Sequence, residues 1–274
     1  MRASARLDSV QRRATDGGVG WEWTRRAALL GGLCAPGAAR AADMVAGETG
    51  VVAAVTGGDT LRLRSGLEVR LAAITAPRRS EPFGREAREG LAGLARGRPV
   101  RLSYGGDRLD RYNRALAQLH TLSPDGQPDF WVQEEMVRQG LARVYTWPDE
   151  AVDADALYRV EREARARARG LWGDTFYGVR APDPNPLAQH VDSLQIVEGI
   201  VTDVAEVRGQ VFLNFGADYR TDFTVAIARS HARRFRDMDL PGLTGARVRV
   251  RGWVELINGP MIWASHPARI EVLS

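Results

Sequence analysis

The sequence predicts a mainly β protein with helices, built from two small barrels that are joined by a linker. Short apolar runs alternate with polar residues and glycine-rich turns in two separate parts of the chain. Stretches with helical spacing interrupt these runs, and a segment with three closely spaced prolines separates the two parts. With 274 residues, 44% of them hydrophobic, the chain is long enough for about two domains of ordinary size.

In the first part, the runs VVAAV, TLRLR and LEVRLAAI lie between residues 47 and 104 and are separated by Gly57-Gly58 and Ser65-Gly66. Such runs are typical of strands joined by tight turns. Apolar spacing then predicts a helix over 86–96, strands over 100–103 and 115–122, and a helix over 130–140.

A further helix is predicted over residues 153–169, which are rich in alanine, arginine and glutamate and end before Gly170. Its arginines alternate with Glu161 and Glu163. We interpret this face as a solvated one rather than as a nucleic-acid patch, because the two charges alternate.

The second part begins after a segment with Pro182, Pro184 and Pro186 and no apolar periodicity, which predicts a stiff extended linker over 175–193. A second small barrel is expected over 194–274. Its predicted elements are one helical piece over 230–238 and five strands over 196–204, 211–215, 223–227, 248–256 and 261–272.

The net charge of +4 comes from the N-terminus, because residues 1–41 hold seven arginines against three acidic residues. The remaining chain has 31 basic and 31 acidic side chains, and every basic residue is arginine. Bulk attraction to a polyanion is therefore excluded, and only local groups of arginines can supply affinity for phosphate.

Residues 1–41 are typical of a twin-arginine export signal. Arg25-Arg26 precedes a short apolar run, and Ala39-Arg40-Ala41 has the small-x-small pattern of a cleavage site. The alternative is an amphipathic N-terminal helix, and the run is short for a membrane span. We expect a periplasmic or secreted protein with no membrane insertion after the signal is removed.

Cys34 is the only cysteine and lies within this predicted signal, after Leu33 rather than after a small residue. Lipid anchoring is therefore disfavoured. The mature chain has no thiol, which excludes disulfides and cysteine-ligated metals.

Four motifs follow one another at residues 56–63, 69–77, 110–117 and 136–145: TGGDTLRL, VRLAAITAP, DRYNRALA and MVRQGLARVY. With Gly170-Leu171-Trp172 after them, the chain over about residues 47–174 resembles the staphylococcal nuclease (thermonuclease) family in order and spacing. The resemblance implies an OB barrel of five strands with three helices. It also implies cleavage of DNA or RNA phosphodiesters with calcium.

The resemblance also assigns roles to residues. Arg70 and Arg114 fall on the two arginines that hold the scissile phosphate, where planar guanidinium groups stabilise developing negative charge. Asp59 falls on a calcium-ligand aspartate, and Tyr112 falls on a tyrosine that contacts the substrate phosphate. Asp110 is expected to hold the loop that carries Arg114.

A base-stacking aromatic residue is also implied, at Tyr145 or at Trp147. A stacking platform needs an exposed ring.

Two acids of the family pattern are missing, because Thr75 and Arg78 stand in their positions. Thr75 brings no charge to a calcium site, and the guanidinium of Arg78 cannot act as a general base. Two outcomes stay open. Glu81 replaces the missing base after the loop reshapes, or Arg70, Arg78 and Arg114 form a pocket that binds phosphate without cutting, which we favour.

The second barrel resembles the OB-like tail of some bacterial thermonuclease-like proteins, and the face of strands 2 and 3 is where OB barrels bind oligonucleotides or proteins. His231 and His266 have no acidic or histidine partner at metal-ligand spacing, so neither is predicted to bind a metal. Aromatic residues in strands are more often core than binding residues. The binding candidates are Phe212, Phe215, Tyr219, Arg220, Phe223 and Trp253.

The sequence therefore predicts an exported thermonuclease-like protein that binds DNA or RNA phosphodiesters, with hydrolysis weak or lost. The alternatives are an active calcium-dependent endonuclease with Glu81 as its base, and an envelope module that binds another protein. The oligomeric state is left open.

Overall fold

The computed structural model describes residues 44–147 and 153–273. These residues form two compact units, within 38–178 and 179–274. The predicted export signal and Cys34 lie outside the described residues. No helix in the described part of the chain is long and apolar enough to cross a membrane.

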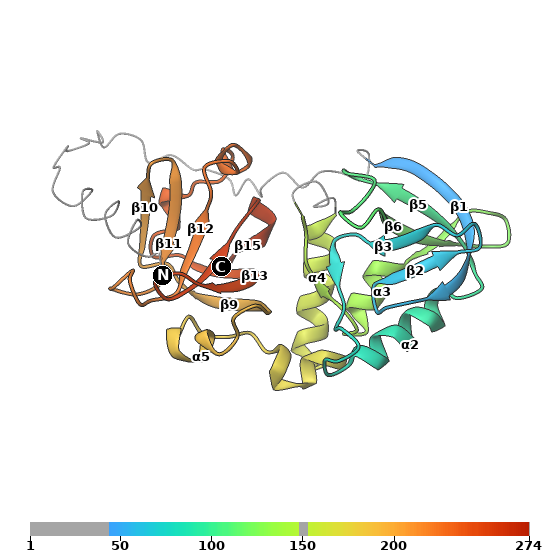
Figure 1. Cartoon of the computed structure of the whole chain (residues 1–274), viewed down its shortest axis with the longest axis horizontal. Helices are drawn as coiled ribbons and strands as arrows, with labels where there is room; N and C mark the ends of the chain where they lie inside the picture. The colour runs from blue at the N-terminus through green and yellow to red at the C-terminus, as the bar shows by residue number, and fades with distance from the viewer. Residues whose placement is uncertain (1–43, 148–152, 274) are drawn as a thin grey trace. The chain divides into compact units, whose positions relative to one another are not determined.

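The first unit is a closed barrel of five strands (Figure 1). The strand order is β3-β2-β1-β5-β6, and the parallel pair β3–β6 closes the circle. Its interior is filled by fully buried leucines: Leu61, Leu71, Leu102 and Leu119. The strands are β1 (Val45–Val55), β2 (Thr60–Leu63), β3 (Glu68–Leu71), β5 (Pro99–Tyr104) and β6 (Ala115–Leu122).

Three helices accompany this barrel: α2 (Gly84–Ala95), α3 (Val132–Arg138) and α4 (Ala154–Ala166). The predicted helix over 130–140 starts late, because Pro128–Trp131 form strand β7, paired with β6. A short pair, β4 (Ile74–Thr75) with β8 (Arg143–Val144), lies outside the barrel. The one-turn helices η2 (Gly170–Gly173) and η3 (Thr175–Tyr177) end the unit. The predicted class, a mainly β protein with an OB barrel and helices, is confirmed.

Helix α4 is not the fully solvated helix that the charge pattern predicts. Leu157 and Val160 are buried as expected, but Glu161 is also fully buried, at 0% exposure. Its carboxylate accepts a hydrogen bond of 2.8 Å from the backbone N–H of Val144. A buried carboxylate needs such a partner, so Glu161 ties α4 to strand β8.

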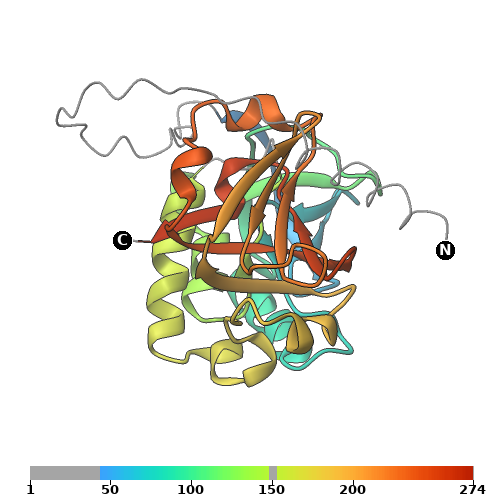
Figure 2. The same cartoon turned by 90° about the vertical axis from the view of Figure 1, so that its left-hand side faces the viewer.

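The second unit repeats the strand order of the first. Its sheet runs β10-β11-β12-β14-β13, and β9, which precedes β10 in the chain, pairs with β13. If β9 and β10 are counted as one bent strand, numbering the barrel strands along the chain gives the order 1-2-3-5-4-1 in both units. The parallel pair between strands 3 and 5 is β3–β6 in the first unit and β12–β14 in the second. In Figure 2 these strands face the viewer. The strands are β9 (Leu194–Ile200), β10 (Asp203–Val207), β11 (Gln210–Asn214), β12 (Thr224–Ile227), β13 (Arg247–Leu256), β14 (Pro260–Trp263) and β15 (Ile270–Leu273).

Two local predictions for this unit are wrong. Residues of the expected extended linker form a short helix, α5 (Pro184–Ala188), which Asp183 caps through the N–H of Asn185. Leu187 is part of the hydrophobic core, so this segment is held by burial. The helical piece expected over 230–238 is reduced to a single turn, η4 (Ala232–Phe235).

The aromatic candidates of the second barrel separate into different environments. Phe215 and Phe223 lie in the main core, with ring centroids 5.0 Å apart. Phe212 belongs to a smaller apolar cluster with Ala226 and Met261. The side chain of Trp253 is 37% exposed. Core packing therefore explains two of these aromatic residues.

Candidate nucleic-acid interface

Arg70 and Asp59 form an ion pair at the β2–β3 hairpin. The Nη1 atom of Arg70 lies 3.2 Å from Oδ2 of Asp59, and the two side chains are only 18% and 16% exposed. Residue 70 pairs with Thr60 across the hairpin, which brings it beside Asp59. The same Nη1 atom donates to the carbonyl oxygens of Leu71 and Ile74, at 3.0 and 3.1 Å. All of these contacts use one nitrogen of the guanidinium group.

Arg70 lies in strand β3, and Arg114 lies directly before strand β6, the parallel neighbour of β3. In the parallel pair β3–β6, Arg70 is opposite Leu116, and Arg114 lies two residues before Leu116. Neighbouring strands lie about 4.8 Å apart, so the turn that ends at Arg114 enters the sheet close to Arg70. Two guanidinium groups at this spacing can reach one phosphodiester.

A tight turn positions Arg114. The Oδ1 atom of Asp110 accepts the N–H groups of Tyr112 and Arg114, and its Oδ2 atom lies 2.8 Å from Nε and 2.6 Å from Nη2 of Arg114. Burial raises the pKa of Asp110, but the bonds from Arg114 and Tyr112 outweigh it and lower the pKa below its usual value. Asn113 takes the left-handed φ of 63° that the turn requires. The predicted loop-holding role of Asp110 is confirmed.

Tyr112 is 63% exposed, and the guanidinium carbon of Arg114 lies 5.2 Å from the centre of its ring. Arg111 lies over the same ring, at 4.8 Å. The tyrosine is therefore accessible from solvent beside the phosphate-binding candidate Arg114.

The loop that carries Arg78 and Glu81 is fixed by its own bonds. The carboxylate of Glu81 accepts the N–H of Arg78 at 2.7 Å, and the N–H of Glu81 donates to the carbonyl of Arg78 at 2.9 Å. The hydroxyl of Tyr177 donates to the carbonyl of Pro82 at 2.6 Å. Burial and the charge of Glu81 raise the pKa of Tyr177. Glu81 thus closes this turn, and these bonds must break before its carboxylate can move. Arg78 itself is exposed.

The two candidates for a stacking aromatic differ in accessibility. Tyr145 is only 4% exposed, whereas Trp147 is 47% exposed, and their rings meet edge to face at 5.4 Å. Tyr145 therefore has little ring surface for a base, and Trp147 is the better placed of the two.

The residues around Asp59 do not fit a calcium ion. Its Oδ2 atom accepts the N–H of Ala76 at 3.0 Å besides contacting Arg70, and its Oδ1 atom accepts the hydroxyl of Thr60 at 3.0 Å. Thr75, the neighbour of Ala76, offers only a neutral hydroxyl. Within residues 44–147 and 153–273, no three His, Cys, Asp or Glu side chains come together as a metal site. Calcium prefers six to eight oxygens, including carboxylates, and here one carboxylate is already paired with a cation.

Sequence patterns did not reveal two side chains that support this site. Gln133 of helix α3 is fully buried and binds strand β6, because its amide oxygen accepts from the N–H of Leu119 and its nitrogen donates to the carbonyl of Ala117. The same nitrogen lies 3.4 Å from the carbonyl oxygen of Ala72, directly after β3. Tyr177 holds the Arg78 loop from a distant part of the chain. Each contact depends on tertiary structure, so no local signal marks them.

Comparison with known proteins gives a consistent match. A family model described as "Staphylococcal nuclease homologue" matches residues 68–174. An "Uncharacterized endonuclease" of Escherichia coli O157:H7 is 36% identical over 129 residues, 46% of this chain and 77% of that protein. A "Micrococcal nuclease" of Shigella flexneri is 34% identical over 131 residues, 46% of this chain and 74% of that protein. The range 68–174 contains Arg70 and Arg114.

Proposed function

Because the chain belongs to the staphylococcal nuclease family, we propose that its first barrel binds nucleic-acid phosphodiesters with little or no hydrolysis. The groups that hold the phosphate are Arg70, Arg78 and Arg114. The observation that carries this proposal is the Arg70–Asp59 ion pair, in which a guanidinium neutralises the single carboxylate left at the metal position. The named endonuclease relatives support nucleic acid as the ligand.

The chemistry of binding follows from the arginines. A guanidinium group donates several hydrogen bonds in a plane and suits phosphate oxygens. Arg70 of strand β3 is held by Asp59, and Arg114, in the turn before β6, is held by Asp110. Little rotamer entropy is therefore lost when a phosphodiester binds. Arg78 adds a third cation from an exposed loop.

Hydrolysis needs a group that takes a proton from the attacking water. Arg78 stands where the family resemblance places that base and cannot accept a proton, and loss of a general base typically costs about 100-fold to 10,000-fold in rate. Glu81, the alternative base, is used to close its own turn. We also propose that residues 1–41 direct export, so that the ligand is met in the periplasm or outside the cell.

The cleavage test uses the purified mature chain with labelled DNA and RNA, with calcium or with a chelator. We expect almost no product from the wild type, and a gain of calcium-dependent cleavage in the Thr75→Asp, Arg78→Glu double variant. Efficient cleavage by the wild type that Glu81→Gln abolishes would establish the endonuclease alternative instead.

The binding test compares Arg78→Gln with Arg85→Gln, which removes the same charge from an arginine that is 74% exposed on helix α2. We expect Arg78→Gln to weaken oligonucleotide binding about tenfold, the effect of one charge-assisted contact, and Arg85→Gln to change it less than twofold. Absence of any binding at low salt would point to a protein partner.

A further inference from the structure

The second barrel brings two loops together at one edge of its sheet. Strands β12 and β14 are parallel neighbours, with Thr224 opposite Met261 and Ala226 opposite Trp263. The carboxyl ends of parallel neighbours meet at the same edge. The N–H of Ala264 donates to the carbonyl of Ala226 at 2.8 Å and continues this pairing just beyond β14. Residues 228–236 and 264–269 therefore leave the sheet side by side.

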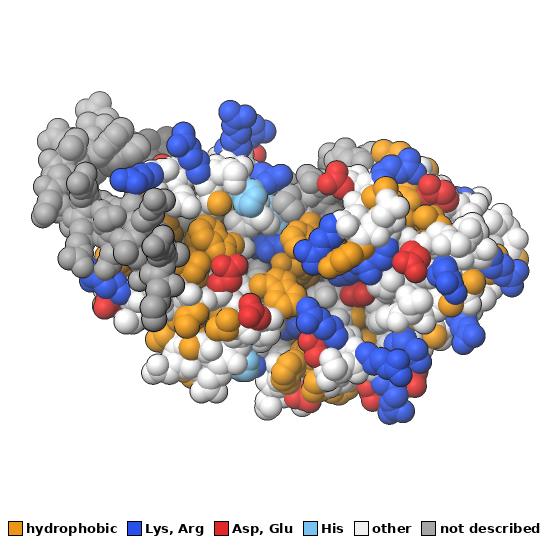
Figure 3. Space-filling model, in the orientation of Figure 1, with side chains coloured by type: hydrophobic (Ala, Val, Ile, Leu, Met, Phe, Trp, Pro, Cys, Tyr) orange, Lys and Arg blue, Asp and Glu red, His pale blue; other side chains and the backbone are white. Residues whose placement is uncertain are grey.

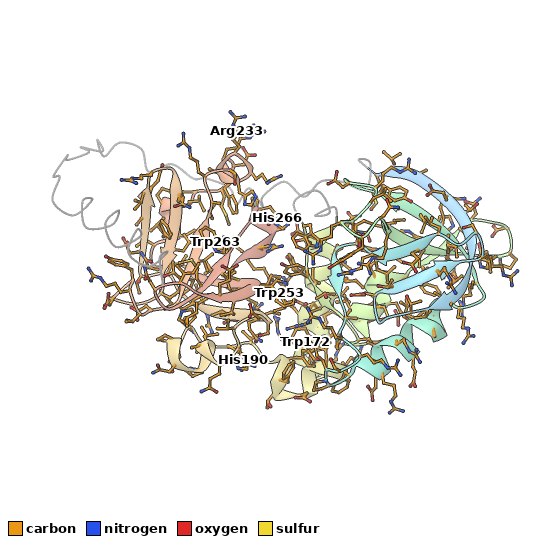
Figure 4. The ribbon with its side chains drawn as sticks, in the orientation of Figure 1. Trp172, His190, Arg233, Trp253, Trp263 and His266 are labelled. Atoms are coloured by element: carbon orange, nitrogen blue, oxygen red, sulfur yellow. The ribbon has the colours of Figure 1, made fainter. Side chains whose placement is uncertain are left out.

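The first of these loops is basic. Four arginines (Arg229, Arg233, Arg234 and Arg236) and His231 lie within residues 229–236. Phe235 anchors the turn η4 in the core at 1% exposure, while Arg233 and Arg234 remain exposed. Figure 3 shows basic side chains gathered around a histidine at this end of the unit. In Figure 4 Arg233 points away from the strands, and His266 lies closer to them.

The second loop contributes a buried imidazole. His266 is only 3% exposed, yet neither Nδ1 nor Nε2 has a hydrogen-bond partner, and the buried hydroxyl of the adjacent Ser265 has none either. Buried polar groups are nearly always hydrogen-bonded, and a neutral imidazole has one donor and one acceptor to satisfy. A polar ligand that reaches these buried atoms therefore breaks no existing side-chain hydrogen bond.

The charges around this imidazole all have one sign. Burial, together with Arg269, Arg234 and His231, lowers the pKa of His266 to about 3. Burial, Arg234 and Arg269 also lower the pKa of His231. In the part of the chain that the structure describes, neither Arg233 nor Arg234 takes part in an ion pair. An anion at this edge of the sheet would relieve the repulsion among these groups.

We propose that Arg234, His231 and His266 form a phosphate-binding site at this edge of the second barrel. A phosphate oxyanion can accept from a guanidinium, an imidazole N–H and the hydroxyl of Ser265 at once, because it carries several acceptor oxygens. The source of the phosphate is a phosphodiester of nucleic acid or a free phosphate. This site is separate from Arg70 and Arg114 and does not rest on the function proposed for the first barrel.

The test follows the ring protons of His231 and His266 by NMR in the full chain carrying Arg70→Gln and Arg114→Gln, which remove the first-barrel arginines. The probes are inorganic phosphate and a single-stranded oligonucleotide of about 12 nucleotides. We expect phosphate to raise the pKa of His266 by about one unit or more, because an anion favours the imidazolium form. A response to the oligonucleotide as well identifies nucleic acid as the source, and a response to phosphate alone identifies free phosphate.

Arg234→Gln is expected to reduce the pKa response of His266 and to weaken phosphate binding about tenfold. Arg236→Gln is the matched control, because it removes the same charge from a side chain that is 80% exposed and paired with Asp237. If neither probe shifts His231 or His266, or if the two variants respond equally, the proposed site is wrong. Failure here leaves the Arg78 result for the first barrel unaffected.

Discussion

The turn that holds Arg114 should depend on Asp110 for much of its stability. Asp110→Ala removes the acceptor of two backbone N–H groups and the partner of Arg114, whose Nη2 lies 2.6 Å from Oδ2. The side chain of Asp110 is 13% exposed, so water replaces these bonds poorly. A hydrogen bond to a charged group contributes about 1.5 to 3 kcal/mol, so we expect the loss of these bonds to cost at least about 3 kcal/mol. For a chain of this size that lowers Tm by about 6 to 12 °C.

Thermal unfolding followed by circular dichroism measures this effect, with Asp107→Ala as the control. Asp107 lies in the same loop and is exposed. Because the pKa of Asp110 lies below its usual value of 3.8 when folded, its contribution is present above that pH. The Tm difference between wild type and Asp110→Ala should therefore shrink as the pH falls below 3.8. If Asp110→Ala unfolds at the same temperature as Asp107→Ala, the hydrogen bonds of Asp110 do not stabilise the fold as proposed.

Three further predictions concern other parts of the fold. Gly84→Ala should destabilise the first barrel by about 2 kcal/mol, because its Cβ would lie 2.0 Å from the carbonyl of Arg78, whereas Gly93→Ala, with no atom within 4 Å, should stabilise α2 by up to about 1 kcal/mol. Chemical denaturation of both variants distinguishes these signs, and equal effects would contradict the packing described for Gly84. Glu161→Ala should cost about 2 kcal/mol because it removes the buried carboxylate to which the N–H of Val144 donates, while Glu163→Ala on the exposed side of α4 should cost less than about 0.5 kcal/mol. Similar denaturation midpoints would show that Glu161 does not tie α4 to strand β8. The pKa of His266 is depressed from 6.5 to about 3, so its neutral form stabilises the fold above pH 6.5 and this contribution is lost as the pH falls towards 3. His266→Gln should flatten the fall in stability over this range, and an unchanged pH profile would refute the assignment.

The order of elements could be predicted because alternation and helical spacing are local properties of the sequence. Strand β6 follows the predicted bounds 115–122, where buried and partly buried positions repeat along the strand. The predicted helix over 130–140 begins late because Pro128 and Trp131 pair with Leu122 and His120 of β6 across a hairpin. The helix at Pro184–Ala188 also depends on tertiary structure, because Leu187 is buried in the core of the second barrel. The local sequence predicted a linker there.

The site could be predicted as a set of residues but not as a set of partners. The order and spacing of the motifs identified Asp59, Arg70 and Arg114 as site residues. The hairpin register then decides that Asp59 pairs with Arg70, and the fold of the 78–84 loop decides that Glu81 closes its own turn. Glu161 illustrates the general reason, because its charge suggested a solvated face until the backbone N–H of Val144 was placed against it.

The central claim is that guanidinium groups, rather than a calcium ion, hold the phosphodiester in the first barrel. Fluorescence anisotropy of a labelled single-stranded oligonucleotide tests this directly, with titrations in calcium and in chelator at equal ionic strength. The full mature chain carries Arg234→Gln, which weakens the site proposed in the second barrel. We predict the same Kd in both conditions and a steep weakening with added salt. Binding that appears only when calcium is present would contradict the claim.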